Sequence, residues 1–116
     1  MPHNFPKSSE ILGKASEHGL YGKLLQQLEK DFELANIEFE IHLKILPFEL
    51  QQQLQEKVYH LLMEKFNDYL NLLYVIDVPE KEFKQIASTD IVEISLFVSY
   101  LILKREWQKV WFKSKH

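Results

Sequence analysis

The residues best suited to bind a charged partner lie near the end of the chain. Lys104, Arg105, Lys109 and Lys113, here called the basic row, share this stretch with two tryptophans. Spacings of four place the last three cations on one side of a helix. Cations beside aromatic rings can bind phosphates, and stacking on tryptophan adds to such binding. Cations near a helix C-terminus also interact favourably with the helix dipole, so a structural role for the basic row stays open.

The charge of the chain is divided unevenly along its length. The formal net charge is −3, with −7 carried by residues 1–103 and +4 by residues 104–116. This asymmetry makes the basic row a candidate surface for an acidic partner or for nucleic acid. The net acidity of the whole chain favours another role, because a nucleic-acid domain usually has a strongly basic overall balance.

A second group of polar side chains lies on a long helix expected in the middle of the chain. His60, Glu64, Asp68 and Asn71, here called the polar stripe, recur at steps of four, four and three. Histidine and carboxylates can hold a metal or transfer a proton. However, no histidine in the sequence has the Glu-x-x-His spacing of di-iron bundles. The stripe also lies opposite an apolar face, so we predict a solvated surface and no metal site.

The sequence contains no motif for a catalytic residue or a cofactor. It has no cysteine, no glycine-rich phosphate loop and no HExxH or GxSxG motif. We therefore predict no cofactor, and the absence of catalytic motifs favours a protein that is not an enzyme. Aromatic residues at helical spacing could line a ligand pocket, although core packing is the more usual meaning of such spacing. These residues are Tyr59, Phe66, Tyr69, Trp107 and Trp111.

The elements that must position these residues are mainly helices. Of 116 residues, 46% are apolar, and only 3 are glycine and 4 are proline, so breakers are few. Apolar residues recur at three- and four-residue steps in residues 21–35, 48–75 and 91–113, and a short helix is expected at 79–87. Asp90 is expected to cap the last helix. The sequence thus predicts a mainly α fold, a small helical bundle of three to four helices.

Two segments differ from this helical pattern. Residues 1–19 are rich in proline, glycine and serine, and we expect a mobile N-terminal tail there, followed by a single helical domain at 20–116. Residues 37–46 alternate apolar and polar side chains, which is typical of a half-buried strand. A strand needs a partner, either near residues 74–78 or in a second copy of the chain. An extended linker and a continued helix stay open as alternatives for this segment.

The favoured function is a non-enzymatic protein-interaction module that forms a homodimer or binds another protein. Residues 91–103 have almost no polar side, which leaves more apolar surface than three or four helices cover. One alternative is a module that binds nucleic acid or an acidic partner through the basic row. Another is a ligand-binding or enzymatic helical domain with the aromatic pocket. The apolar stretch is shorter than the roughly 20 residues that span a bilayer, and residues 1–20 lack a signal-peptide core, so we expect no membrane contact and a cytoplasmic location.

Overall fold

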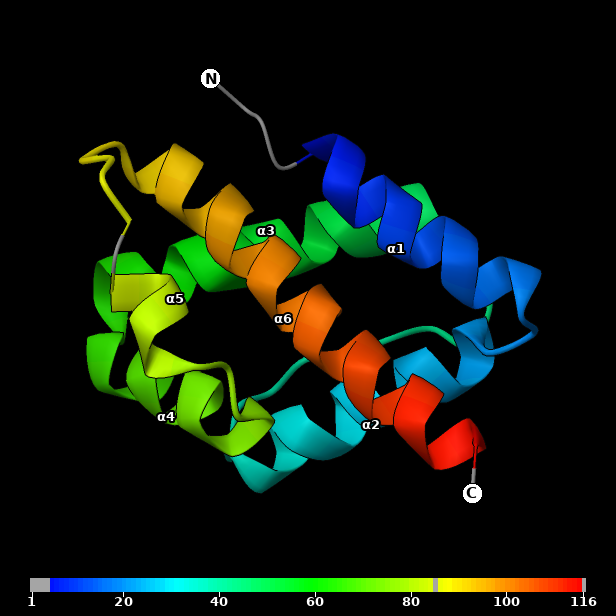
Figure 1. The fold of residues 1–116 in the computed structure, drawn as a ribbon. Coiled ribbons are helices and arrows are strands. Elements are labelled where there is room, and N and C mark those ends of the chain that lie inside the picture. Colours follow the sequence, from blue (N-terminus) through cyan, green and yellow to red (C-terminus); the bar gives the residue numbers. More distant parts are fainter. Residues whose placement is uncertain (1–4, 85, 116) are drawn as a thin grey trace.

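The last helix, α6, crosses the whole molecule and contacts all the other helices that the structure describes. The computed structural model of the chain describes residues 5–84 and 86–115. These residues form six helices and no strand, which confirms a mainly α fold but exceeds the expected three to four helices (Figure 1). The helices are α1 (Phe5–Glu17), α2 (Tyr21–Leu34), α3 (Pro47–Glu64), α4 (Phe66–Ile76), α5 (Glu80–Lys84) and α6 (Ile91–Ser114).

Helix α6 begins at the cap that the sequence predicts. The Asp90 side chain accepts hydrogen bonds from the backbone N–H groups of Val92 and Glu93, at 2.8 and 3.4 Å, and so satisfies two donors of the first turn. From there α6 lies over α3, with α1 on one flank and α4 and α5 on the other (Figure 1). Because helices cover several of its sides, the first half of α6 can be apolar nearly all round.

Helix α1 occupies most of the segment where a mobile tail was expected. Its residues Ile11, Leu12 and Ala15 lie on one helical face and are buried. That face packs against α6 and α3, and Ser8 is buried beside it. Of the residues that suggested a tail, Ser9 and Ser16 lie on the solvent side of this helix, and Pro6 lies in its first turn, where proline is tolerated. Apolar periodicity over a short stretch was the stronger local signal, and residues 1–4 lie outside the described part of the chain.

Residues 48–75, expected as one helix, form two helices that break at Lys65. The backbone angles of Lys65, φ −141° and ψ 62°, lie outside the helical region. A straight helix over the expected range would be roughly 42 Å long at 1.5 Å per residue. The molecule measures 37 Å along its longest axis, so such a helix would extend beyond the core. The break turns α4 back over the core, where Leu72 and Leu73 are buried.

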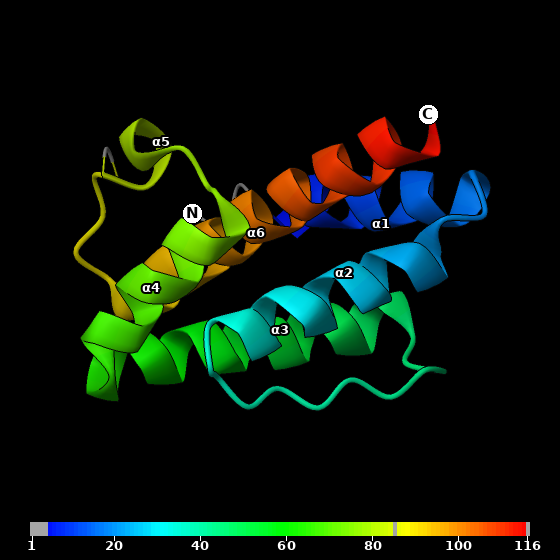
Figure 2. The ribbon, with the colours of Figure 1, turned by 90° about the horizontal axis from the view of Figure 1, so that it is seen from below.

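Residues 37–46, here called the strap, form an extended linker and neither a strand nor a helix. Helices α2 and α3 run in the same direction, so the chain must return along α2 before α3 can start (Figure 2). An extended chain covers that distance with few residues. Ile41 and Ile45 are buried, whereas Leu43 is 75% exposed. The Tyr21 hydroxyl donates a 2.6 Å hydrogen bond to the carbonyl oxygen of Ile45, which fastens the end of the strap to α2.

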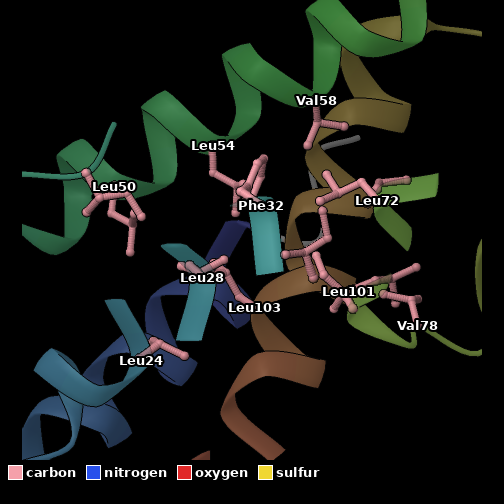
Figure 3. Packing of buried hydrophobic residues seen from close by; sticks show 14 of the residues in the cluster. Leu24, Leu28, Phe32, Leu50, Leu54, Val58, Leu72, Val78, Leu101 and Leu103 are labelled. Atoms are coloured by element: carbon pink, nitrogen blue, oxygen red, sulfur yellow. The ribbon is translucent and has the colours of Figure 1, made fainter. Parts of the chain in front are cut away.

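The hydrophobic core lies between α1, α2, α3, α4 and α6. Figure 3 shows Phe32 of α2 beside Leu54 of α3, and Leu28 of α2 beside Leu103 of α6. All four side chains are almost completely buried. Against this core, the second half of α6 carries both the basic row and the two tryptophans, so the packing of α6 decides what each of these side chains faces.

Candidate functional site

Two members of the basic row contact the segment around α5. Lys104 Nζ lies 3.1 Å from Glu82 Oε2. Arg105 donates 3.0 Å hydrogen bonds from Nε to the carbonyl oxygen of Asp77 and from Nη2 to Asp77 Oδ2. These contacts hold α6 against the end of α4 and against α5. The charges of Lys104 and Arg105 are therefore already paired within the chain.

The other two members of the basic row join α6 to α2 and α4. Lys109 Nζ donates hydrogen bonds to Asp31 Oδ2 at 2.5 Å and to the carbonyl oxygen of Ile76 at 3.0 Å. Lys113 Nζ donates to Gln27 Oε1 at 3.0 Å. Helical spacing correctly places these lysines on one side of α6, but spacing alone does not show that α2 and α4 cover that side. The contacts favour a structural role for the basic row over the partner-binding role.

A carboxyl group with no exposed surface, that of Glu106, lies beside these contacts. Its Oε1 atom is 2.7 Å from Lys109 Nζ, and Asp31 is only 3% exposed. Burial raises the pKa of Glu106 to about 9, and its hydrogen bond with Asp31 acts in the same direction. Glu106 is therefore protonated at neutral pH and donates that proton to the hydrogen bond with Asp31. Asp31, Glu106 and Lys109 are here called the buried cluster.

Asp31 keeps its negative charge within the buried cluster. Burial by itself raises the pKa of Asp31, but hydrogen bonds with Glu106, Lys109 and Gln27 outweigh burial and lower the pKa. At neutral pH the cluster thus contains one anion, one cation and one neutral carboxylic acid, so its charges balance. Such a closed arrangement stabilises the packing of α6 on α2 and gives a substrate no access to Glu106.

The tryptophans lie on the opposite flank of α6, beside α1. The Trp107 and Trp111 rings are 5.6 Å apart. His18, which follows α1, stacks on Trp107 at 6.2 Å and meets the edge of Trp111 at 4.8 Å. Lys115 Nζ lies 4.4 Å from the centre of the Trp111 ring, within the range of a cation–π interaction. The rings therefore join the end of α1 to the last turns of α6.

Next to these rings, residues of α1 and α6 line a surface cleft of about 340 Å³. The cleft, here called the α1–α6 cleft, is lined by Lys7, Glu10, Ile11, Lys14, Tyr100, Lys104, Trp107 and Gln108. Lys7 Nζ lies 5.8 Å from the centre of the Tyr100 ring. Lys7, Lys14 and His18 were not among the candidate residues, because they lie in the expected tail. Their steps of seven and four residues, which match a helix face, were the signal that could have identified them.

A second cleft of about 340 Å³ lies between α2 and the end of α6. This α2–α6 cleft is lined by Leu20, Lys23, Gln26, Gln27, Lys30, Val110, Lys113 and Ser114. It resembles the α1–α6 cleft in volume and in its three lysines. It differs in having no aromatic ring among these lining residues, so it offers charge without a stacking surface.

The polar stripe is divided by the break between α3 and α4. His60 Nδ1 lies 3.7 Å from Glu64 Oε2, and both side chains are exposed. Asp68 lies in the first turn of α4, and Asn71 Nδ2 donates a 3.2 Å hydrogen bond to the carbonyl oxygen of Ala35. Among the described residues, no three His, Cys, Asp or Glu side chains are grouped so that they could hold a metal ion. Asn71 is thus a tether between α4 and the end of α2.

The five aromatic residues considered as a pocket are distributed over different parts of the fold. Phe66 and Tyr69 contact each other on α4, with ring centres 5.4 Å apart. Trp107 and Trp111 contact each other on α6, beside α1. The cleft at Trp107 is lined by neither Phe66 nor Tyr69, and Tyr59 is not among its lining residues. The structure therefore offers a smaller aromatic site beside α1 in place of the expected pocket.

The end of α3 and the outer side of α4 expose a row of large apolar side chains. Their exposed fractions lie between 38% and 83%, and they follow one another at steps of four, three, four and four residues. This apolar row consists of Tyr59, Met63, Phe66, Leu70 and Tyr74. Charged side chains border it, because Glu64 and Lys65 lie at the break and Asp68 lies in the first turn of α4. Exposed apolar side chains with charged neighbours are the kind of residues that a protein interface combines.

No protein-family model, curated protein or solved structure matches this chain. Within residues 5–84 and 86–115, no helix has the length and apolar character needed to cross a bilayer. Function must therefore be inferred from the surfaces of the chain itself, and the apolar row and the α1–α6 cleft are the two surfaces with a distinctive chemistry.

Proposed function

We propose that the chain is a non-enzymatic protein-interaction module whose apolar row contacts a second copy of the chain in a homodimer. The observation that carries this proposal is the exposure of five large apolar side chains at the end of α3 and on α4, on both sides of the break at Lys65. Single exposed apolar residues are ordinary, but a contiguous apolar surface with a polar border is typical of interaction sites.

Helix α6 gives this proposal less support than its sequence suggested. Val98, Leu101 and Ile102 are buried within the chain, so most of the apolar surface of α6 already has a partner. The basic row is engaged in internal contacts, which weakens the alternative of a nucleic-acid partner bound through it. Unsatisfied apolar surface is instead present on α4, whose inner side fills the core while its outer side remains exposed.

A second copy is the partner that best fits the apolar row. In a two-fold symmetric dimer the same patch lies on both sides of the interface, so an apolar patch is complementary to itself. Glu64 and Lys65 border the row and carry opposite charges, which allows ion pairs to form across the two-fold axis. A net charge of −3 per chain is small enough for two copies to associate without strong repulsion.

Size-exclusion chromatography with light scattering tests the proposal directly. We expect twice the monomer mass at high micromolar concentration and dissociation on dilution. The double variant Met63→Ser and Tyr74→Ser should be monomeric, because both side chains are exposed and lie near opposite ends of the row. Circular dichroism should show that the variant keeps its helices.

The matched control changes two other exposed apolar residues, Leu43 in the strap and Phe48 at the start of α3. They are 75% and 74% exposed. The double variant Leu43→Ser and Phe48→Ser should remain dimeric. If this control dissociates while the Met63 and Tyr74 variant remains dimeric, the interface lies at the strap and the apolar row is not the contact. A wild-type chain that is monomeric at high micromolar concentration would overturn the homodimer altogether.

A further inference from the structure

The two clefts beside the second half of α6 offer different chemistry to a ligand. Each has a volume of about 340 Å³, which lies within the usual range of small-molecule sites. The α1–α6 cleft combines three lysines with the rings of Tyr100 and Trp107. The lining of the α2–α6 cleft has three lysines but no aromatic ring. A ligand that carries both negative charge and a flat ring would therefore prefer the α1–α6 cleft.

We propose that the α1–α6 cleft binds a nucleoside di- or triphosphate, with the base against Trp107 and Tyr100 and the phosphates beside Lys7 and Lys14. This site lies away from the apolar row and does not depend on the proposed dimer. A nucleoside phosphate is the small-molecule class that joins a flat, stackable base to several negative charges, and both parts have a counterpart in the cleft.

The lysines of α1 are placed to hold a chain of phosphates. Lys7 and Lys14 are separated by two helical turns, or roughly 10 Å along the axis of α1. That separation suits two or three linked phosphate groups better than a single one, because each lysine can contact a different phosphate. Within the described residues neither Lys7 nor Lys14 has an ion pair, and Lys7 Nζ lies over the Tyr100 ring. The Lys14 ammonium is therefore available to a ligand, and the Lys7 ammonium carries no ion pair but lies close to the Tyr100 ring.

The remaining charges of the cleft leave it net positive. Three lysines and Glu10 line it, which gives a net charge of +2. Lys104 is held by Glu82 and supplies less free charge than the α1 lysines. The negative charge of Glu10 limits the affinity of the cleft for anions. Salt should weaken the binding of an anion, because it screens the charges of Lys7 and Lys14. A bare phosphate gains nothing from the rings and should bind less tightly than a nucleoside phosphate.

The ring side of the cleft provides the second half of the recognition. Trp107 and Tyr100 line the cleft from the same flank of α6, seven residues apart. Trp107 is half-buried and is held by His18 and Trp111, so its orientation is restricted before a ligand arrives. A restricted ring loses less conformational freedom when a base stacks on it.

Intrinsic fluorescence measures binding at this place without a label. The sequence contains two tryptophans, Trp107 and Trp111, and both belong to this group of rings. Titration with ATP should quench their fluorescence in a saturable way at submillimolar to millimolar concentration. Adenosine and inorganic tripolyphosphate should each bind at least about fivefold more weakly than ATP, because each lacks one half of the contacts.

Two matched charge variants locate the site. Lys7→Gln with Lys14→Gln should weaken ATP binding at least about fivefold, since it removes both phosphate contacts. Lys23→Gln with Lys30→Gln removes the same charge from the α2–α6 cleft and should leave ATP binding unchanged. Lys7 lies over the Tyr100 ring, and the other three lysines have no hydrogen bond or ion pair among the described residues. The helices should therefore be retained in both variants, and circular dichroism would verify this.

The outcomes separate the proposal from its alternatives. Absence of saturable quenching by ATP up to several millimolar would overturn it. Equal affinity for tripolyphosphate and ATP would show that the rings contribute nothing, and the nucleoside assignment would be wrong. Loss of binding in the Lys23 and Lys30 variant alone would place the anion in the α2–α6 cleft. Saturable ATP binding that is lost only with Lys7 and Lys14 would support the proposal.

Discussion

The buried carboxyl of Glu106 should make the stability of the chain fall as the pH rises. In the folded chain its pKa is about 9, because burial disfavours the ionised form. In the unfolded chain a glutamate has a pKa of about 4.3. Over the interval between these values the folded state holds a proton that the unfolded state has released. The stabilising contribution of protonated Glu106 is therefore complete below the lower pKa and is lost as the pH rises towards the higher one.

The size of this effect follows from the separation of the two pKa values. Each pH unit within the interval lowers the free energy of unfolding by about 1.4 kcal/mol. Between pH 5 and pH 8 the loss due to Glu106 is about 4 kcal/mol, a large part of the roughly 5–15 kcal/mol that stabilises a small domain. Asp31 acts in the opposite sense, because its pKa is lowered in the folded chain. Its contribution is lost only as the pH falls below its ordinary pKa, outside this interval.

The variant Glu106→Gln isolates the effect, because glutamine has a similar shape and can donate a hydrogen bond to Asp31 but does not ionise. Urea unfolding, followed by circular dichroism at each pH and at one protein concentration, gives the free energies. The free energy of unfolding of the variant, minus that of the wild type, should rise by about 4 kcal/mol from pH 5 to pH 8. The control Glu33→Gln removes an exposed carboxylate from α2 and should keep the wild-type pH dependence. Parallel curves for Glu106→Gln and wild type would refute the reasoning.

Two further predictions use the same unfolding assay at pH 7. Lys109→Met leaves the Asp31 charge buried without its cation and should cost about 3 kcal/mol. Lys104→Met breaks a more exposed ion pair and should cost at most about 1 kcal/mol, so equal losses would contradict the assigned burial. In the strap, Ile41→Ala should cost about 2–4 kcal/mol because Ile41 is buried. Leu43→Ala should change stability by less than about 0.5 kcal/mol, and a similar cost for both variants would show that the strap does not pack as described.

The helices could be predicted wherever local sequence determines them. The apolar spacing of α2 and the Asp90 cap of α6 are both present in the structure. The break at Lys65 could not be predicted, because no glycine or proline marks it and its cause is the limited length of the core. In the strap, alternation correctly identified Ile41 and Ile45 as inward-facing residues but wrongly placed Leu43, which is 75% exposed, on the same side. It could not decide between a strand and a linker, since that depends on whether another backbone lies alongside.

The candidate sites were harder to predict than the helices for a related reason. Helical spacing gives the direction of a side chain relative to its neighbours on the same helix, and it does so correctly for Lys109 and Lys113. What lies in that direction is decided by elements far away in the sequence. Asp31 is 78 residues from Lys109, and Gln27 is 86 residues from Lys113. No local pattern in α6 contains that information.

Uneven charge along the sequence does not become uneven charge on the surface in this fold. Three cations of the basic row, Lys104, Arg105 and Lys109, are neutralised by the carboxylates of Glu82, Asp77 and Asp31 from earlier segments, whereas Lys113 contacts the neutral side chain of Gln27. The lysines of the α1–α6 cleft that have no ion pair among the described residues are Lys7 and Lys14, which belong to the part of the chain expected to be a tail. Any anion-binding activity should therefore follow the integrity of α1 more closely than the charge of α6, because α1 supplies both the free cations and one wall of the cleft.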